Sequence, residues 1–287
     1  MSTSESAAQE NATGEPGPVV PAEPGSSAEA APSRLDFAPS PVFVLLVGVT
    51  AMAGWLSWTR GEAAVFGPDT AYAPFVFILG GWIVCLTLHQ YARSAAAYRL
   101  GDRALRGTGY LRLNPFAFRE LAAGLLLPVA FALVGLFGLN GPAAHLDRAA
   151  VPGRGRRALV ALAGLPVNAV LAAALAAAVF WLVPAGSTTN NWFIVSLMFL
   201  CFLNVSAALL NLLPVPGTDA FDAIAAGLGR WFPGRNAGIF GTVAVFALVW
   251  CPPVNAVFLD AVFALFTLVG VNELYLSWGQ AMLRPFQ

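Results

Sequence analysis

Long apolar runs separated by short polar stretches constrain the fold of this chain more than any other feature. Seven such runs follow residue 40, and they cover residues 41–58, 73–92, 121–139, 157–183, 192–213, 238–250 and 254–278. The hydrocarbon core of a bilayer needs about 20 apolar residues per helix. The run at 238–250 is marginal by this measure. The sequence therefore predicts an all-α polytopic membrane protein with six or seven transmembrane helices.

The overall composition excludes a stable soluble globule. Hydrophobic residues make up 58% of the chain and charged residues only 10%, whereas a soluble domain carries about 25% charged residues. The formal net charge is zero, so nothing indicates a nucleic-acid partner. We expect a multi-pass protein of a bacterial-type cell membrane, with the lipid bilayer as its first partner.

The first 38 residues differ in kind from the rest. Residues 1–38 are rich in Ala, Ser, Glu, Pro and Gly, and they hold six acidic side chains against the single basic residue Arg34. Such a segment buries too little apolar surface to offset the entropy of ordering it. It also begins without the positive and apolar regions of a signal peptide. We predict a disordered acidic tail over 1–38 and an integral membrane domain over 39–287.

Arginines are concentrated on both sides of the third apolar run. Six lie in residues 93–119 and four in residues 148–157. Because arginine excess marks the cytoplasmic side of a membrane, two basic flanks conflict with a crossing of 121–139. Either this run is re-entrant, with Pro128 at its turn, or one loop departs from the rule. Within the first arginine-rich stretch, residues 107–115 alternate like a strand and predict a small β-hairpin at the membrane surface.

Three ionisable side chains within or beside the apolar runs form the candidate functional site. His89 and Arg93 are four residues apart near the end of the second run, so a helix places them on one face. Asp219 directly follows a break at residues 214–217, where prolines and a glycine end the fifth run. Ionisable groups at membrane depth are costly and mark functional sites.

Four short elements occur in order over residues 83–222. They are HQYAR at 89–93 with YRLGD at 98–102, GYLRLNP at 109–115, AGLPVN at 163–168 and NLLPVPGTD at 211–219. The first resembles the H-E-x-x-H motif of the site-2 protease family, with the R-L-G-D stretch that follows it. The last resembles the family's N-L-x-P-x-P-x-L-D-G motif, and the middle two resemble its hairpin and its A-G-P-x-x-N element. The resemblance implies a site-2-protease-like core at about 73–225.

The site residues of the family can be matched one by one to positions of this sequence. In active members two histidines and the later aspartate bind zinc, and the glutamate after the first histidine activates the metal-bound water. His89 matches the first ligand and Asp219 the carboxylate ligand. Gln90 stands in place of the glutamate, and Arg93 stands in place of the second histidine. The resemblance thus implies a degenerate member with no intact catalytic residue and no expected cofactor.

These two replacements have direct chemical consequences. The neutral amide of Gln90 cannot act as a general base, a role that supplies about 10²–10⁴-fold in rate. Arg93 has no free lone pair and stays protonated, so it cannot be a metal ligand. We predict that its guanidinium pairs with Asp219, directly or through one water, with His89 nearby. The alternative is that Arg93 extends its charged end to the lipid headgroups.

Three asparagines on the predicted helices are secondary candidates. Asn168, Asn204 and Asn211 suit interhelical hydrogen bonds. By the family resemblance, asparagines at such places also bind the substrate strand. Both roles remain open at the level of the sequence.

The remaining polar side chains in or near the runs favour plainer roles. Cys85 is four residues before His89 and suits helix packing, although a Cys85–His89–Asp219 metal site is conceivable. His145 is expected to be a solvated loop histidine. Asp222 is expected to orient Asp219 or to face water.

Two acidic residues lie in the last apolar run. Asp260 and Glu273 have few cations nearby in the sequence. They are expected to face a polar cavity or a partner.

Three functions are therefore in competition. The leading hypothesis is a catalytically inactive pseudoprotease that binds or regulates a membrane partner, such as a transmembrane protein segment. The second is an active zinc-dependent intramembrane metalloprotease with an atypical site, in which case zinc is the cofactor. The third is a component of a transporter or channel, which needs a continuous polar path. The metal content of the purified protein separates the first two.

Overall fold

Helices make up all the regular structure that the computed structural model describes. It describes residues 34–60, 68–135, 137–143, 146–147, 149–184, 189–229, 235–269 and 274–283, and no strand occurs among them. The α-helices are α1 Pro41–Arg60, α2 Pro68–Leu100, α3 Leu127–Gly135, α4 Arg154–Leu162, α5 Leu165–Leu182, α6 Trp192–Leu210, α7 Asp219–Leu228, α8 Arg235–Val249, α9 Pro252–Val269 and α10 Leu274–Met282. Short 3-10 turns lie at Arg34–Asp36, Arg103–Leu105 and Pro115–Ala117, and a π-helical turn lies at Ala122–Leu126.

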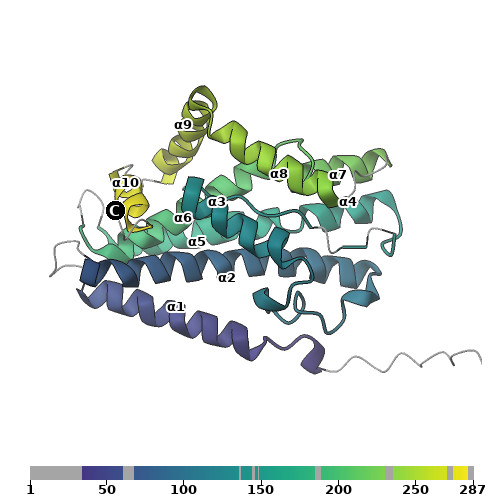
Figure 1. The fold of residues 1–287 in the computed structure, drawn as a ribbon, viewed down its shortest axis with the longest axis horizontal. Coiled ribbons are helices and arrows are strands. Elements are labelled where there is room, and N and C mark those ends of the chain that lie inside the picture. Colours follow the sequence, from purple (N-terminus) through teal and green to yellow (C-terminus); the bar gives the residue numbers. More distant parts are fainter. Residues whose placement is uncertain are drawn as a thin grey trace, which may run out of the picture. The chain divides into compact units, whose positions relative to one another are not determined.

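The long helix α2 is the element against which several other helices pack. It packs against α1, α4, α5 and α6, and α1 runs beside the N-terminal part of α2 in Figure 1. Ile78, Trp82 and Leu86 are fully buried along one side of α2, at the i, i+4 spacing that places side chains on one helical face. This apolar face fixes α2 in the core and so fixes the polar residues near its C-terminal end.

Four helical segments are long and apolar enough to cross a membrane. They are Pro41–Arg60, Tyr72–Leu100, Arg154–Leu182 and Trp192–Leu210. The pair α8 and α9 would count as a fifth only as a broken span, because the two helices are bent by 89° at their junction. The break lies between Val249 and Pro252, directly before two prolines, which cannot continue the preceding helix but can begin the next one. The described residues thus support four or five spans, and the expected six or seven are not confirmed.

The run 121–139 does not form a span. Its helical part is the short apolar stretch Ala122–Val134, and residues 137–143 continue without helix and are buried. The arginine-containing segments on either side pack together, since Leu105 and Leu111 share a small core with Val151 and Val160. The segment therefore returns to the end of the protein from which it started. Both basic flanks therefore lie at one end of the fold, as a re-entrant segment requires.

The turn of this re-entrant segment is not at Pro128, as the sequence suggested. Pro128 lies inside a continuous helical stretch, directly after the π-helical turn Ala122–Leu126, and a π-helical turn is one of the irregularities that accompany a proline within a helix. Its carbonyl accepts a hydrogen bond from the indole nitrogen of Trp82 at 3.4 Å. The chain instead reverses beyond the end of α3, since Gly141 lies against the backbone of Ala123 at the start of the segment.

Residues 107–115 also differ from the expected β-hairpin. They form consecutive turns rather than paired strands. Leu113 adopts a positive φ of 53°, which a strand residue does not. Tyr110 is buried and stacks on Phe118 with ring centroids 4.4 Å apart. The alternation of apolar residues in this stretch therefore reflects burial within a compact loop.

The predicted acidic tail lies almost wholly outside the described residues. Residues 1–33 are not described, and disorder over 1–38 stays a prediction. At its end, Asp36 accepts a hydrogen bond from Nε of Arg106 at 2.8 Å, and both side chains are partly exposed. This pair joins the start of the membrane domain to the arginine-rich end of the fold.

Candidate functional site

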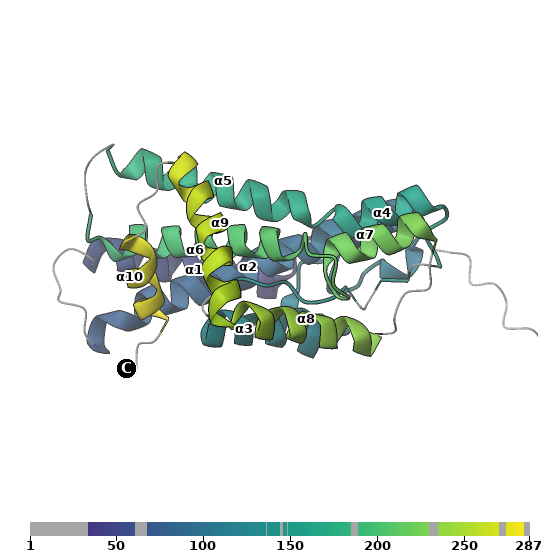
Figure 2. The same cartoon turned by 90° about the horizontal axis from the view of Figure 1, so that it is seen from above.

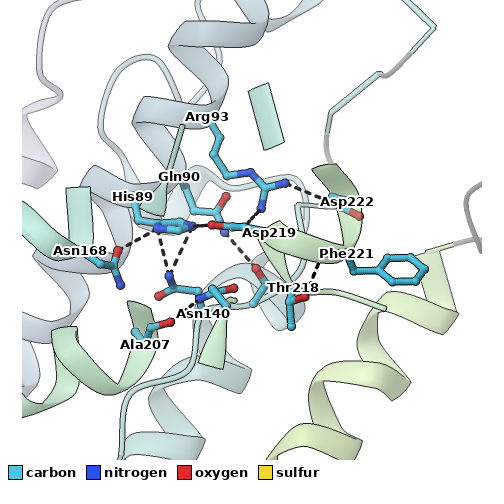
Figure 3. Close-up of polar contacts among 12 residues, drawn as sticks. His89, Gln90, Arg93, Asn140, Asn168, Ala207, Thr218, Asp219, Phe221 and Asp222 are labelled. Atoms are coloured by element: carbon cyan, nitrogen blue, oxygen red, sulfur yellow. Dashed lines mark hydrogen bonds and ion pairs between the residues drawn. The ribbon is translucent and has the colours of Figure 1, made fainter. Parts of the chain in front are cut away.

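The C-terminal half of α2 supplies three buried polar side chains to one cluster. His89, Gln90 and Arg93 are each at most 1% exposed. His89 and Arg93 lie one helical turn apart and point into the same cluster in Figure 3. Burying such groups is stable only when they find partners, so the rest of the fold must supply them.

The break after α6 supplies the acidic side of the cluster. Asn211 caps α6, and the chain then turns through Gly217, whose φ is +99°. A Cβ at Gly217 would lie 2.3 Å from the carbonyl oxygen of Gly238, so both the conformation and the space require glycine here. The hydroxyl of Thr218 then caps α7 by accepting a hydrogen bond from the backbone N–H of Phe221 at 3.4 Å. This start of α7 places Asp219 in its first turn, at the positive end of the helix dipole.

Arg93 bridges two carboxylates of α7. Its Nη1 lies 2.5 Å from Oδ1 of Asp219, and its Nη2 lies 3.1 Å from Oδ2 of Asp222. The two acids are three residues apart, so they share a face of α7. One planar guanidinium can therefore donate to both of them. Figure 3 shows the arginine lying between the two carboxylates.

His89 completes the cluster on the other side of Asp219. Its Nε2 lies 3.4 Å from Oδ2 of Asp219, and its Nδ1 lies 2.8 Å from Oδ1 of Asn168. Nδ2 of Asn140 lies 3.0 Å from the same Nδ1. A Cβ at Gly164 would lie 2.2 Å from Cε1 of His89. The break between α4 and α5 therefore packs directly against the imidazole, which leaves room only for glycine.

Gln90 is directed toward the re-entrant segment. Its Nε2 donates to the backbone carbonyl of Gly141 at 3.4 Å. Its Oε1 is buried without a hydrogen-bond partner in the part of the chain that the structure describes. The amide thus links α2 to the buried stretch 137–143 (Figure 3).

The secondary candidates divide between the cluster and the helix packing. Asn168 contacts His89 directly. Asn204 donates to Sγ of Cys85 at 3.3 Å and to the carbonyl of Leu200, so it joins α6 to α2. Asn211 donates to the carbonyl of Ala207 within its own helix. Their part in binding a substrate strand stays a prediction.

Two contributors to the cluster were missed or underestimated from the sequence. Asn140 was not singled out, although a polar Asn-Gly-Pro run between apolar segments was a signal for it. Asp222 was expected only to orient Asp219 or to face water, whereas the structure places it on the second nitrogen of Arg93. His145 and Glu273 lie outside the described residues.

The cluster does not fit a zinc ion. Among the residues that the structure describes, no group of three or more His, Cys, Asp or Glu side chains is arranged to hold a metal. His89 and Asp219 are adjacent, but Arg93 donates to the carboxylate from the position where a third ligand would be needed. Three protein ligands are usual for catalytic zinc, and a fixed positive charge repels a dication. Cys85 does not supply the missing ligand, because its sulfur contacts Asn204.

Charge around Asp219 also governs its protonation. Burial by itself would raise the pKa of this carboxyl group, but the positive charge of Arg93, followed by the His89 contact, holds the pKa below its usual value. A carboxyl group with a lowered pKa stabilises the folded state above its unfolded pKa, and it loses that contribution as the pH falls through the folded pKa.

We therefore expect an acid-dependent loss of stability that depends on Asp219. The measurement is a series of thermal unfolding experiments in detergent between pH 7 and pH 3. At neutral pH the Tm of the wild-type protein should be higher than the Tm of Asp219→Asn. This difference should shrink below about pH 4, where free aspartate protonates. Asp147→Asn, at an exposed loop position, is the control and should follow the wild-type profile. Parallel profiles for wild type and Asp219→Asn would contradict the assignment.

Comparison with known proteins gives relatives over most of the chain. A protein of Mycolicibacterium smegmatis named "Putative zinc metalloprotease Rip2" is 32% identical over 260 residues, which are 88% of this chain and 96% of the relative. A Mycobacterium tuberculosis protein of the same name is 35% identical over 252 residues, covering 86% and 93%. No family model matches the chain, and no solved structure matches it. The name Rip2 is given to members of the site-2 protease family. The chain therefore belongs to the site-2 protease family.

Proposed function

We propose that this chain is a pseudoprotease, a catalytically inactive member of its family that binds or regulates a membrane partner. The observation that supports this most is the position of Arg93, whose guanidinium contacts Asp219 and Asp222 where a metal-binding imidazole would be needed. The arginine supplies the positive charge that a metal would otherwise bring to the buried carboxylates. The helices α2 and α7 then stay docked without a metal.

The residue at the general-base position supports the same proposal. A working member needs a carboxylate there to take a proton from water. Gln90 offers an amide, and this amide donates to the carbonyl of Gly141. It acts as a structural link between α2 and the re-entrant segment rather than as a base.

The proposed role includes a location and an orientation. We place the protein in a bacterial-type cell membrane as a multi-pass protein, with its four or five candidate spans crossing the bilayer. Both arginine-rich segments pack at one end of the fold, and arginine excess marks the cytoplasmic side. That end is therefore assigned to the cytoplasm, and the partner is a transmembrane protein segment.

A zinc-dependent intramembrane metalloprotease with an atypical site is the second candidate. The names of the relatives favour it, as does the 3.4 Å approach of His89 Nε2 to Asp219 Oδ2. This candidate requires Arg93 to leave the carboxylate and another ligand to replace it. It predicts metal in the purified protein.

Metal content tests the proposal directly. We expect full-length protein purified without chelator to contain less than about 0.1 zinc per chain, against about one for an occupied structural or catalytic site. We also expect no cleavage of a transmembrane peptide substrate. His89→Ala is the matched control, because it removes the one histidine of the cluster. Stoichiometric zinc that is lost in His89→Ala, together with peptide cleavage by the wild type, would establish the second candidate instead.

A further inference from the structure

The outward face of α9 carries an acidic side chain in an otherwise apolar surface. Asp260 lies near the middle of this helix and is its single ionisable residue. The exposed residues around it are spaced three or four apart, so they form one face: Ala256, Val257, Asp260, Ala261, Ala264 and Thr267. Val257, one turn from Asp260, is 70% exposed. The opposite side of α9 is buried through Val262 and Phe266.

In the described part of the chain, the carboxylate of Asp260 has no binding partner. No cation or hydrogen-bond donor among the described residues contacts its carboxylate, and the hydroxyl of Thr267 already donates to the carbonyl of Phe263. The helices α8 and α9 together are apolar enough to enter a membrane. Figures 1 and 2 show α9 turning away from α8 at their junction. Near the middle of a membrane-embedded helix, a carboxylate that faces lipid is costly and calls for a partner of opposite charge.

We propose that the outward face of α9, centred on Asp260, binds a membrane helix of a partner protein that carries an arginine or lysine at the matching depth. The small side chains at Ala256, Ala261 and Ala264 allow a second helix to approach closely. The cation of the partner then offsets the charge of the carboxylate within the apolar surroundings. This inference rests on the proposed partner-binding role and gives that partner a surface and a charge.

Charge complementarity also argues against a second copy of this chain as the occupant. Residues 236–269, which hold the apolar parts of α8 and all of α9, contain no basic residue. Two copies joined through the same face would bring two Asp260 carboxylates together, and like charges repel. A different protein with a basic residue in its membrane helix has the complementary charge.

The test uses full-length protein in phosphatidylcholine vesicles and a leucine-rich single-span peptide with one central arginine. A matched peptide carries leucine at that position. Association is followed by energy transfer between labelled protein and labelled peptide. We expect the arginine peptide to bind wild-type protein about tenfold more tightly than the leucine peptide. Asp260→Ala should abolish this preference, whereas Thr267→Ala, on the same face, should retain it.

Three results would overturn the proposal. The first is equal binding of the two peptides to the wild type. The second is reaction of Asp260→Cys, in a Cys251→Ala background, with a membrane-impermeant maleimide as fast as Arg156→Cys, because this places residue 260 in water. The third is self-association of the labelled protein that is lost in Asp260→Ala, which makes the occupant a second copy.

The outcome is separable from that of the pseudoprotease proposal. Zinc in the wild-type protein would overturn the inactive site and leave the peptide preference unaffected. Equal peptide binding by zinc-free protein would overturn only the α9 surface. The variants at 260 and 267 lie on α9, away from the contacts made by His89, Arg93 and Asp219.

Discussion

Arg93→Ala is expected to lower the free energy of unfolding by about 3–5 kcal/mol, the usual cost of removing one member of a buried ion pair. The arginine is 1% exposed and contacts the carboxylates of Asp219 and Asp222. Its removal leaves two neighbouring carboxylates with little access to water. Reversible unfolding in mixed micelles of dodecyl maltoside and dodecyl sulfate measures the change.

The chain contains a matched control for this prediction. Arg106 pairs with Asp36 at 2.8 Å, but both side chains of that pair are partly exposed. Exposed pairs contribute about 0–1 kcal/mol, so Arg106→Ala should have a small effect. Equal losses in Arg93→Ala and Arg106→Ala would show that the buried cluster is not held together by charge.

A compensated variant separates the charge from the packing. The triple change Arg93→Met, Asp219→Asn and Asp222→Asn removes all three charges while keeping side chains of similar size. Replacement of a whole buried ion group by neutral residues is often neutral or stabilising. We therefore expect the triple variant to recover most of the stability that Arg93→Ala loses. A triple variant as unstable as Arg93→Ala would assign the loss to packing instead.

The second large effect is a gain of metal binding in Gln90→Glu/Arg93→His. This double variant restores the H-E-x-x-H pattern on one face of α2, and Asp219 already lies 3.4 Å from His89. Two histidines and one aspartate are a sufficient ligand set for zinc, and the glutamate is then placed to act on bound water. We expect about one zinc per chain in the double variant, against less than about 0.1 in the wild type.

Zinc should also stabilise the double variant and leave the wild type unaffected. A ligand that binds only the folded state adds about 2.7 kcal/mol at a hundredfold excess over its dissociation constant. Thermal unfolding with and without zinc measures this. Gln90→Glu alone keeps Arg93 and should bind no zinc, and adding His89→Ala to the double variant should abolish binding. A folded double variant that stays free of zinc would show that the backbone around the cluster no longer permits metal coordination.

Features of the site that depend on local spacing could be predicted from the sequence. The four-residue separation of His89 and Arg93 places both on one face of any helix. The prolines before Asp219 end α6 wherever that helix lies, because proline cannot continue a helix. The apolar runs likewise determine an all-helical membrane protein, since only helices and closed barrels satisfy the backbone within lipid. These conclusions need no knowledge of which segments meet.

Features that depend on which segments meet were decided only by the tertiary structure. The sequence left open whether residues 121–139 cross the membrane or re-enter, and the structure adds that their two flanks pack together through Leu105, Leu111, Val151 and Val160. Residues 107–115 alternate like a strand, but no neighbouring strand pairs with them in the described region, so they form turns.

The full set of contacts in the cluster likewise could not be predicted from the sequence. The sequence predicted that Arg93 would face Asp219, because two opposite charges at membrane depth stabilise each other. It did not predict that Asp222 would take the second nitrogen of Arg93 or that Asn140 would reach His89. Those contacts depend on the rotation of α7 and on the path of residues 137–143 through the core. Both are set by packing across the whole fold, which local periodicity does not encode.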